Sequence, residues 1–277
     1  MPNRVFPASL LLAILWTSPA LADPAGFLSQ PLSFCGEPVA LNREEVYQAV
    51  DQNLLLLAEA KSRIWLTLRR ASRYRAVIEK ELNRAGAPLD LIYLPLAITG
   101  LSPDYQSGGR GIWRLREAEA RAQGLRVDAN IDERLDPVAA TAAAARIMLA
   151  LKETYGSWTT AMAAYLLGEK VISQLVAEAG GEKYYYQLYL PDDLDQLPAT
   201  VLAGKIIFQN PEAFGYRQAP DRAWAPFPTR RVPVTQAQGT TARLLAAQLG
   251  QDYKTFREMN PHLLTGVIPA GVTVNAP

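Results

Sequence analysis

The chain has 277 residues, of which 49% are hydrophobic, with 28 Lys and Arg against 27 Asp and Glu. This length and hydrophobic content are enough for one or two domains with a buried core. A chain so close to neutral has no overall electrostatic attraction to nucleic acid or anionic lipid, so no nucleic-acid partner is expected.

The first 22 residues have the pattern of a secretory signal peptide. An apolar run over residues 6–16 follows Arg4, and the small-residue triplet Ala20-Leu21-Ala22 follows that run. The run is too short to span a bilayer, and no later segment has the apolar length of a transmembrane helix. We therefore expect cleavage before Asp23 and export to the periplasm. A buried N-terminal helix is the alternative interpretation.

Residues 23–41 are rich in Pro, Gly and Ser without periodicity, which predicts an extended N-terminal arm. The arm holds the single cysteine of the chain, Cys35, so no intramolecular disulfide can form. A lipid-anchored start would need a cysteine directly after the small-residue triplet, and Cys35 lies well beyond it. Pairing with another chain stays open, and a buried thiol is the simpler expectation.

From residue 42 the apolar side chains recur near the helical period, which predicts a helical part over residues 42–88 that ends at Gly86 and Pro88. Four arginines lie within it: Arg69, Arg70, Arg73 and Arg75. Because Glu79 and Glu81 follow, we interpret these arginines as a solvated helix face rather than a nucleic-acid site.

A second helical body is predicted over residues 89–216. Asp136-Pro137 opens one of its helices, since proline is tolerated in the first turn. Small and apolar residues predict another helix from Trp158 to Leu167, and a third covers residues 197–208. The run Tyr184-Tyr185-Tyr186 fits either a sugar-stacking surface or the core.

Prolines mark residues 217–229 as a linker. The last segment, residues 230–277, predicts a strand, two short helices and a strand. It therefore forms a small α+β module of its own.

Three motifs occur in order within the second helical body. They read Leu94-Pro95-Leu96-Ala97-Ile98-Thr99-Gly100-Leu101-Ser102-Pro103, then Gly111-Ile112-Trp113-Arg114-Leu115, then Ala163-Ala164-Tyr165-Leu166-Leu167-Gly168-Glu169. They resemble the motifs LPLxESxFxP, GLWQF and AAYNAGE of lytic transglycosylases, most closely of the membrane-bound murein transglycosylase D type. The resemblance implies a mainly α, lysozyme-like (SLT or goose-lysozyme-type) domain over residues 89–216. Residues 230–277 resemble a LysM module, a small α+β glycan-binding fold.

Enzymes of this family cleave peptidoglycan without water and leave a 1,6-anhydromuramic product. One Glu protonates the glycosidic oxygen and, as a carboxylate, then takes the proton of the muramic acid 6-hydroxyl. In this chain the position of that Glu falls on Ile98, which can neither donate nor accept a proton. Loss of acid–base catalysis costs about 100-fold to 10,000-fold in rate. The resemblance therefore implies a site without its catalytic residue.

Other polar positions of the family site also depart from its pattern. Thr99 replaces Ser, Arg114 replaces Gln, and Leu166 replaces the Asn beside the acid. The resemblance implies that a glycan groove, if kept, is lined by Thr99, Trp113, Arg114, Tyr165 and Leu166. The cluster Asp132-Glu133-Arg134 is a structural turn in this family.

Three functions fit these observations. The first is a catalytically inactive periplasmic protein that binds peptidoglycan strands or scaffolds an envelope machine. The second is an active transglycosylase that uses a displaced carboxylate, for which Asp104 and Glu169 are the candidates. The third is an adaptor whose former sugar groove binds a cell-envelope protein, which apolar Ile98 and Leu166 favour. No cofactor is implied, and a single histidine, His262, supports neither a metal site nor a catalytic triad.

Overall fold

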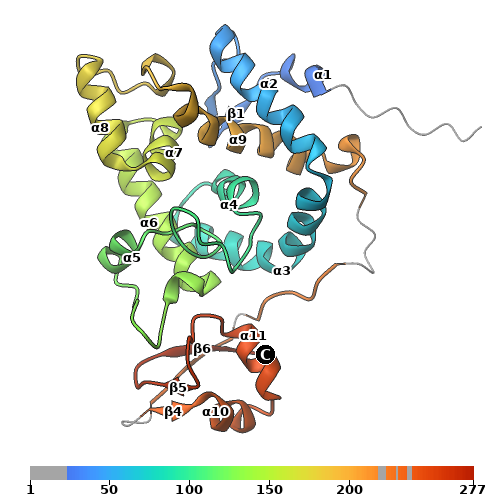
Figure 1. Ribbon diagram of the computed structural model, residues 1–277, viewed down its shortest axis with the longest axis vertical. Helices are drawn as coiled ribbons and strands as arrows, with labels where there is room; N and C mark the ends of the chain where they lie inside the picture. Colours follow the sequence, from blue (N-terminus) through green and yellow to red (C-terminus); the bar gives the residue numbers. More distant parts are fainter. Residues whose placement is uncertain (1–23, 218–222, 229, 236–238) are drawn as a thin grey trace, which may run out of the picture.

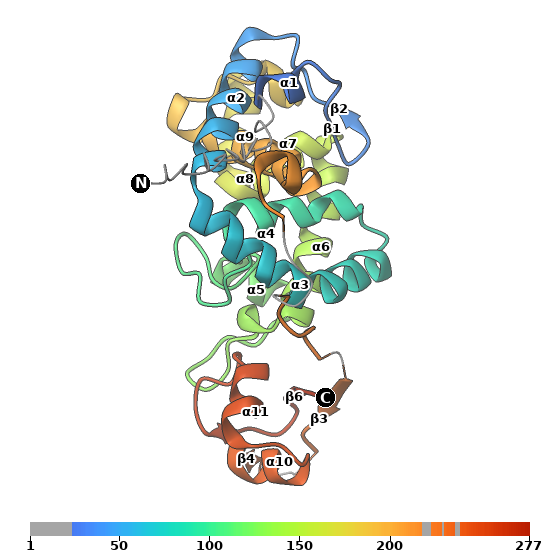
Figure 2. The ribbon, with the colours of Figure 1, turned by 90° about the vertical axis from the view of Figure 1, so that its right-hand side faces the viewer.

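The computed structural model describes residues 24–217, 223–228, 230–235 and 239–277. A helical body carries a small module at one end, and the module stays at that end in both views (Figures 1 and 2). The expected signal peptide, residues 1–22, and residues 218–222 and 229 of the expected linker lie outside the described residues. Within the described ranges, no helix combines the length and hydropathy needed to cross a membrane.

The segment predicted as an extended arm folds back onto the helical body. It contains α1 (Pro24–Leu28) and an antiparallel hairpin of β1 (Ser33–Phe34) and β2 (Glu37–Pro38). The hairpin is held because Phe34 is fully buried in the core and Lys205 Nζ donates to Ser33 O at 2.6 Å. Burial also raises the pKa of the Cys35 thiol, which therefore stays protonated and unreactive at neutral pH.

The predicted helical part consists of two helices, α2 (Glu44–Glu59) and α3 (Lys61–Ala85). They are separated at Ala60, whose ψ of 54° leaves the helical region. The sequence could not indicate this break, because alanine is the strongest helix former. The predicted end is confirmed, since Gly86 takes the left-handed conformation that closes α3.

Residues 89–216, predicted to be helical, form α-helices with short 3₁₀ segments. In chain order these are η1 (Leu89–Ile92), α4 (Tyr93–Ile98), α5 (Glu117–Ala122), η2 (Glu133–Leu135), α6 (Pro137–Tyr155), α7 (Trp158–Leu167), α8 (Glu169–Glu178), η3 (Tyr185–Gln187), α9 (Asp192–Gln209) and η4 (Pro211–Phe214). Helix α6 opens as predicted, because the Asp136 side chain caps it by accepting from Val138 N at 3.1 Å.

Helix α4 is the centre of this body. All of its residues are buried, and α9 packs along it. The two backbones approach so closely that a Cβ at Gly204 of α9 would lie 2.5 Å from the Cβ of Ala97. Interior packing therefore fixes the position of the last residue of α4, Ile98.

Residues of the predicted linker pack against the predicted arginine face of α3. Phe227 is buried and its N–H donates to Arg73 O at 2.8 Å, while the Arg73 guanidinium lies 5.2 Å from the Trp224 ring centroid. Arg70 Nη1 donates to Gly100 O at 3.1 Å. These two arginines are thus partly covered by the chain itself, which differs from the expected solvated face.

The C-terminal module contains the predicted strand, two helices and strand, with two further short strands. Its elements are β3 (Arg230–Pro233), β4 (Thr240–Thr241), α10 (Ala242–Gln248), α11 (Tyr253–Met259), β5 (Val267–Ile268) and β6 (Thr273–Ala276). Strand β3 pairs antiparallel with β6, and β4 pairs antiparallel with β5. A separate hydrophobic cluster fills the space between these elements.

One loop of the helical body joins the module. We call residues 128–132 the junction loop. Its Ile131 is fully buried and packs in the hydrophobic cluster of the module. Asp132 N donates to His262 O at 2.9 Å, and Leu264 N donates to Asn130 O at 2.8 Å. The two parts of the chain therefore share backbone hydrogen bonds and a core residue.

Candidate functional site

The residues predicted to line a glycan groove surround one small cavity at the end of α4. Its volume is about 10 Å³. The lining consists of Leu94, Pro95, Ile98, Thr99, Ile112, Trp113, Arg114, Tyr165 and Leu166. A single water needs about 10–15 Å³, so the cavity holds one water at most and no sugar ring in this conformation.

The polar side chains of this lining are engaged inside the protein. The Thr99 hydroxyl lies 2.9 Å from Pro95 O and 2.7 Å from Ile112 O. Trp113 Nε1 donates to Thr141 Oγ1 at 2.7 Å. Since Thr99, Trp113 and Thr141 are all buried, these bonds hold the loop after α4 against α6.

Tyr165 is held in the same way. Its hydroxyl donates to Trp113 O at 2.6 Å, and both it and Leu166 are buried. Burial raises the pKa of Tyr165, so the phenol is neutral at neutral pH. Tyr165 therefore supplies neither an anion nor an accessible proton.

Two arginines bind backbone carbonyls of residues that line the cavity, and one of the two, Arg114, lines the cavity itself. Arg114 Nη1 donates to Leu166 O at 2.8 Å, and Arg116 donates to Leu166 O at 3.2 Å and Tyr165 O at 3.3 Å. Carbonyls at the C-terminal end of a helix lack intrahelical partners and carry partial negative charge. The guanidinium groups complete the end of α7, which stabilises the closed arrangement.

The loop that carries Arg114 has an uncommon backbone. Arg114 has a φ of 54°, in the left-handed region that side chains other than glycine rarely adopt. The loop also depends on Gly111, where a Cβ would lie 2.0 Å from Arg134 O. The strain at Arg114 is sustained by its hydrogen bonds to Leu166 O and, from Nε at 2.9 Å, to Ser107 O.

No carboxylate belongs to the described lining of this cavity. The two candidates for a displaced acid, Asp104 and Glu169, are exposed and lie outside the lining. Glu119 forms an ion pair with Arg116. A general acid must come within hydrogen-bond reach of the bond that breaks, about 2.6–3.2 Å, and this closed cavity admits no such bond.

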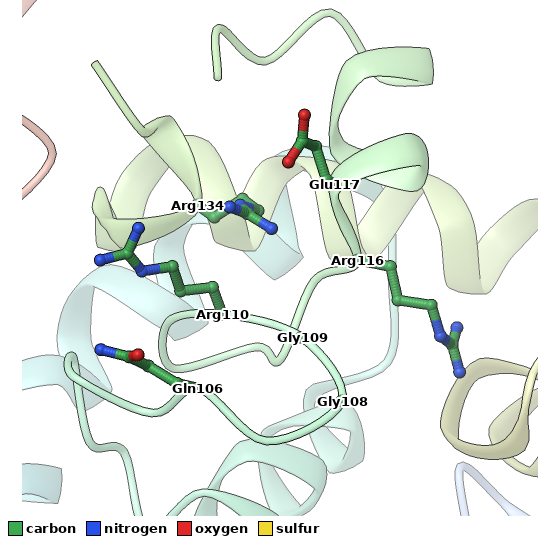
Figure 3. A pocket seen from close by; sticks show the side chains of 7 residues that line it. All are labelled: Gln106, Gly108, Gly109, Arg110, Arg116, Glu117 and Arg134. Atoms are coloured by element: carbon green, nitrogen blue, oxygen red, sulfur yellow. The ribbon is translucent and has the colours of Figure 1, made fainter. Parts of the chain in front are cut away.

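A separate, open pocket of about 440 Å³ is formed mainly by residues between Gln106 and Glu117 (Figure 3). We call it the arginine pocket; it is lined by Gln106, Gly108, Gly109, Arg110, Arg116, Glu117 and Arg134. In Figure 3, Arg110 and Arg134 lie on one side of the loop, and Arg116 points away from them. Guanidinium groups bind carboxylates well. Each of the three here already pairs with a carboxylate of the chain, Asp132 or Glu119, and Glu117 also lines the pocket, so an acidic ligand group would share these arginines with them.

Asp132 positions two of these arginines. It is 1% exposed and accepts from Arg110 Nη1 at 3.0 Å and from Arg134 Nε and Nη2, both at 2.8 Å. The sequence indicated Asp132 and Arg134 as a structural turn, which these contacts support. It did not single out Arg110, whose only signal is its place between Gly109 and Gly111.

His262 is buried in the module, where its Nε2 lies 3.1 Å from Thr273 O. Burial lowers its pKa, so the imidazole is neutral. Among the described residues, no three His, Cys, Asp or Glu side chains are grouped so that they could hold a metal ion.

Comparison with known proteins identifies part of the helical body. The transglycosylase SLT domain family matches residues 93–188. Two curated relatives are the membrane-bound lytic murein transglycosylases D of Escherichia coli strain K12 and of Escherichia coli O6:H1 strain CFT073. Each is 30% identical over 154 residues, which cover 53% of this chain.

The matched segment spans 34% of the length of each of these relatives. The family match contains the closed cavity, the arginine pocket and helices α4 to α8. The chain thus contains a transglycosylase SLT domain, lysozyme-like in type, and is a distant homologue of membrane-bound lytic murein transglycosylase D.

Proposed function

We propose that this chain is a catalytically inactive, lytic-transglycosylase-like protein of the periplasm that binds peptidoglycan. One observation carries the proposal. The position of the family acid holds buried Ile98, 8% exposed, in a cavity of about 10 Å³ that no described carboxylate lines. Glycosidic cleavage needs a positioned proton donor, and this arrangement supplies none.

Peptidoglycan is the proposed ligand because the SLT family acts on it. The closed cavity does not supply the contact surface, since Thr99, Trp113, Tyr165 and Leu166 are buried. The arginine pocket supplies it, where guanidinium groups meet the free carboxylates of the peptides that muramic acid carries. Arg114, at the edge of this loop, is the member of the predicted groove that remains partly exposed. The C-terminal module, which we assign as LysM-like, gives a second contact.

The location follows from the ligand and from the first 22 residues. Peptidoglycan lies outside the inner membrane, and those residues fit an export signal. We therefore assign residues 1–22 to a cleavable signal peptide and the mature chain to the periplasm.

Incubation of the full mature chain with purified peptidoglycan sacculi tests the proposal. The pellet is assayed for bound protein and the soluble fraction for 1,6-anhydro muropeptides by mass spectrometry, with an active lytic transglycosylase as positive control. We expect binding without anhydro products, and Arg110→Ala should weaken binding by about tenfold, the loss of one charge-assisted contact.

Two results would contradict the proposal. Anhydro products that disappear in Asp104→Asn or Glu169→Gln would establish a displaced acid and an active enzyme. If the chain neither binds sacculi nor releases products, peptidoglycan is not its ligand, and the protein adaptor is the function that remains.

A further inference from the structure

A second, larger groove lies at the end of the helical body opposite the module. It has a volume of about 800 Å³ and is formed by α2, by residues 185–190 and by Gln196 of α9. In Figures 1 and 2, α2 and α9 lie at the upper end of the molecule and the module at the lower end. We call it the α2 groove. It shares no lining residue with the Ile98 cavity or the arginine pocket.

One aromatic side chain of the α2 groove, that of Tyr189, is exposed to solvent. Tyr189 is 85% exposed, the highest value among the large hydrophobic side chains of the described residues. An exposed tyrosine presents a flat apolar face with a polar tip, which is the shape that packs against the apolar face of a sugar ring.

Two side-chain amides in the lining of the groove are available to hydrogen-bond a ligand. Gln52 of α2 and Gln187 of the facing segment are exposed, and neither side chain has a hydrogen-bond partner within the part of the chain that the structure describes. An amide both donates and accepts, as a sugar hydroxyl or acetamido group requires of its partner. Gln52 belongs to α2 and Gln187 to the segment of residues 185–190.

The floor of the groove is apolar. It is formed by Val46 and Ala49 of α2 with the rings of Tyr185 and Tyr186, and a smaller cavity of about 10 Å³ lies beneath the same residues. An apolar floor between polar walls suits a ligand that carries methyl groups along a hydroxylated chain. The acetamido methyl of an N-acetylated sugar is such a group.

The described lining of the groove carries no net charge. Its charged members are Arg43 and Glu45, which pair at 2.6 Å. The described part of the lining therefore gives no attraction to a polyanion, and a groove of about 800 Å³ has room for an oligosaccharide.

We propose that the α2 groove binds a neutral oligosaccharide of N-acetylated hexosamines. The proposal deepens the proposed function, because it gives the helical body its own site for the sugar backbone of peptidoglycan. It also separates the two ligand groups: carboxylates at the arginine pocket and neutral sugar rings at the α2 groove.

Titration of the full chain with the N-acetylglucosamine tetramer, followed by amide chemical shifts and calorimetry, tests this inference. The tetramer has no carboxylate and so does not report on the arginine pocket. We expect shifts at Ala49, Gln52 and Gln187. Tyr189→Ala should weaken this binding by about tenfold, since one stacking contact is lost. Leu56→Ala is the matched control, because Leu56 is 62% exposed on α2 but lies outside the groove.

The outcomes separate this inference from the proposed function. Shifts confined to residues 230–277, or no effect of Tyr189→Ala, would overturn the α2 groove even if sacculi still bind. Equal binding of the glucose tetramer would overturn the assignment to acetamido sugars. If the tetramer binds at the α2 groove but the chain does not bind sacculi, this inference is supported and the proposed function is contradicted.

Discussion

Substitution of Ile98 by glutamate restores the residue type of the family acid at this position. It tests whether the cavity around that position is closed. Ile98 is 8% exposed, and its cavity has room for one water at most. The nearby guanidinium groups already have partners: those of Arg114 and Arg116 are bound to Leu166 O, and that of Arg63 is bound to the backbone carbonyls of Ala97 and Ile98. We therefore expect the introduced carboxyl group to be protonated in the folded protein at neutral pH.

The cost follows from the unfolded state, where a glutamate has a pKa of about 4.3. Keeping the carboxyl neutral costs about 3.7 kcal/mol at pH 7 and about 1 kcal/mol at pH 5. The native pKa is raised, so the unfolded state binds fewer protons and stability falls as the pH rises. The expected change between the two pH values is about 2.6 kcal/mol.

Urea unfolding of Ile98→Glu and Ile98→Gln at pH 5 and pH 7 measures this change. Both variants lose the same apolar contacts and gain a side chain of the same size, so their difference isolates ionisation. We expect Ile98→Glu to be less stable than Ile98→Gln by about 1 kcal/mol at pH 5 and by about 3.7 kcal/mol at pH 7. Neither variant should release anhydro muropeptides.

Equal stability of the two variants at both pH values would refute this reasoning, because the carboxylate would then be ionised and paired with an arginine. Anhydro products from Ile98→Glu alone would show that the groove opens readily and that only the acid was missing.

Two further predictions concern the packing of the chain. Gly204→Ala should lower the free energy of unfolding by about 1–3 kcal/mol, since its Cβ would lie 2.5 Å from the Cβ of Ala97, and Ala97→Gly in the same chain should recover part of the loss. The wild-type protein should lose stability as the pH falls below the ordinary histidine value of 6.5, by up to about 1.4 kcal/mol per pH unit, because buried His262 stays neutral while the unfolded chain takes up a proton. Chemical denaturation at pH 7.5 and pH 5 should show this loss in the wild type and a smaller one in His262→Gln, and identical pH profiles would contradict the role of His262.

Local chemistry made several elements predictable. Asp136-Pro137 indicated the start of α6 because both residues suit a helix start, and small apolar residues gave the bounds of α7. The module was predictable because its strands and helices are short and separated by turn residues.

Other features depend on contacts that local patterns do not contain. The hairpin of β1 and β2 forms because the Phe34 ring is buried in a core that is built by residues distant in the sequence. Ala60 breaks a helix despite its strong helical propensity.

The sequence predicted which residues surround the candidate site, but not whether the cavity between them is open or closed. Ile98, Thr99, Trp113, Arg114, Tyr165 and Leu166 do surround one cavity, as the order of the three motifs indicated. The direction in which Arg114 and Arg116 extend could not be read from sequence, since it depends on the left-handed backbone at Arg114 and on carbonyls at the end of α7. That direction decides whether the cavity is open.

The junction loop has a consequence for how the C-terminal module can be used. Small domains bury too little surface to be very stable, and this module completes its interior with Ile131, a side chain that another part of the chain supplies. A buried isoleucine is worth about 1.5–3 kcal/mol, a large share of what a domain of this size has. The module is therefore not an autonomous cassette, and a transplant of residues 230–277 into another protein would have to carry a substitute for Ile131 along with it.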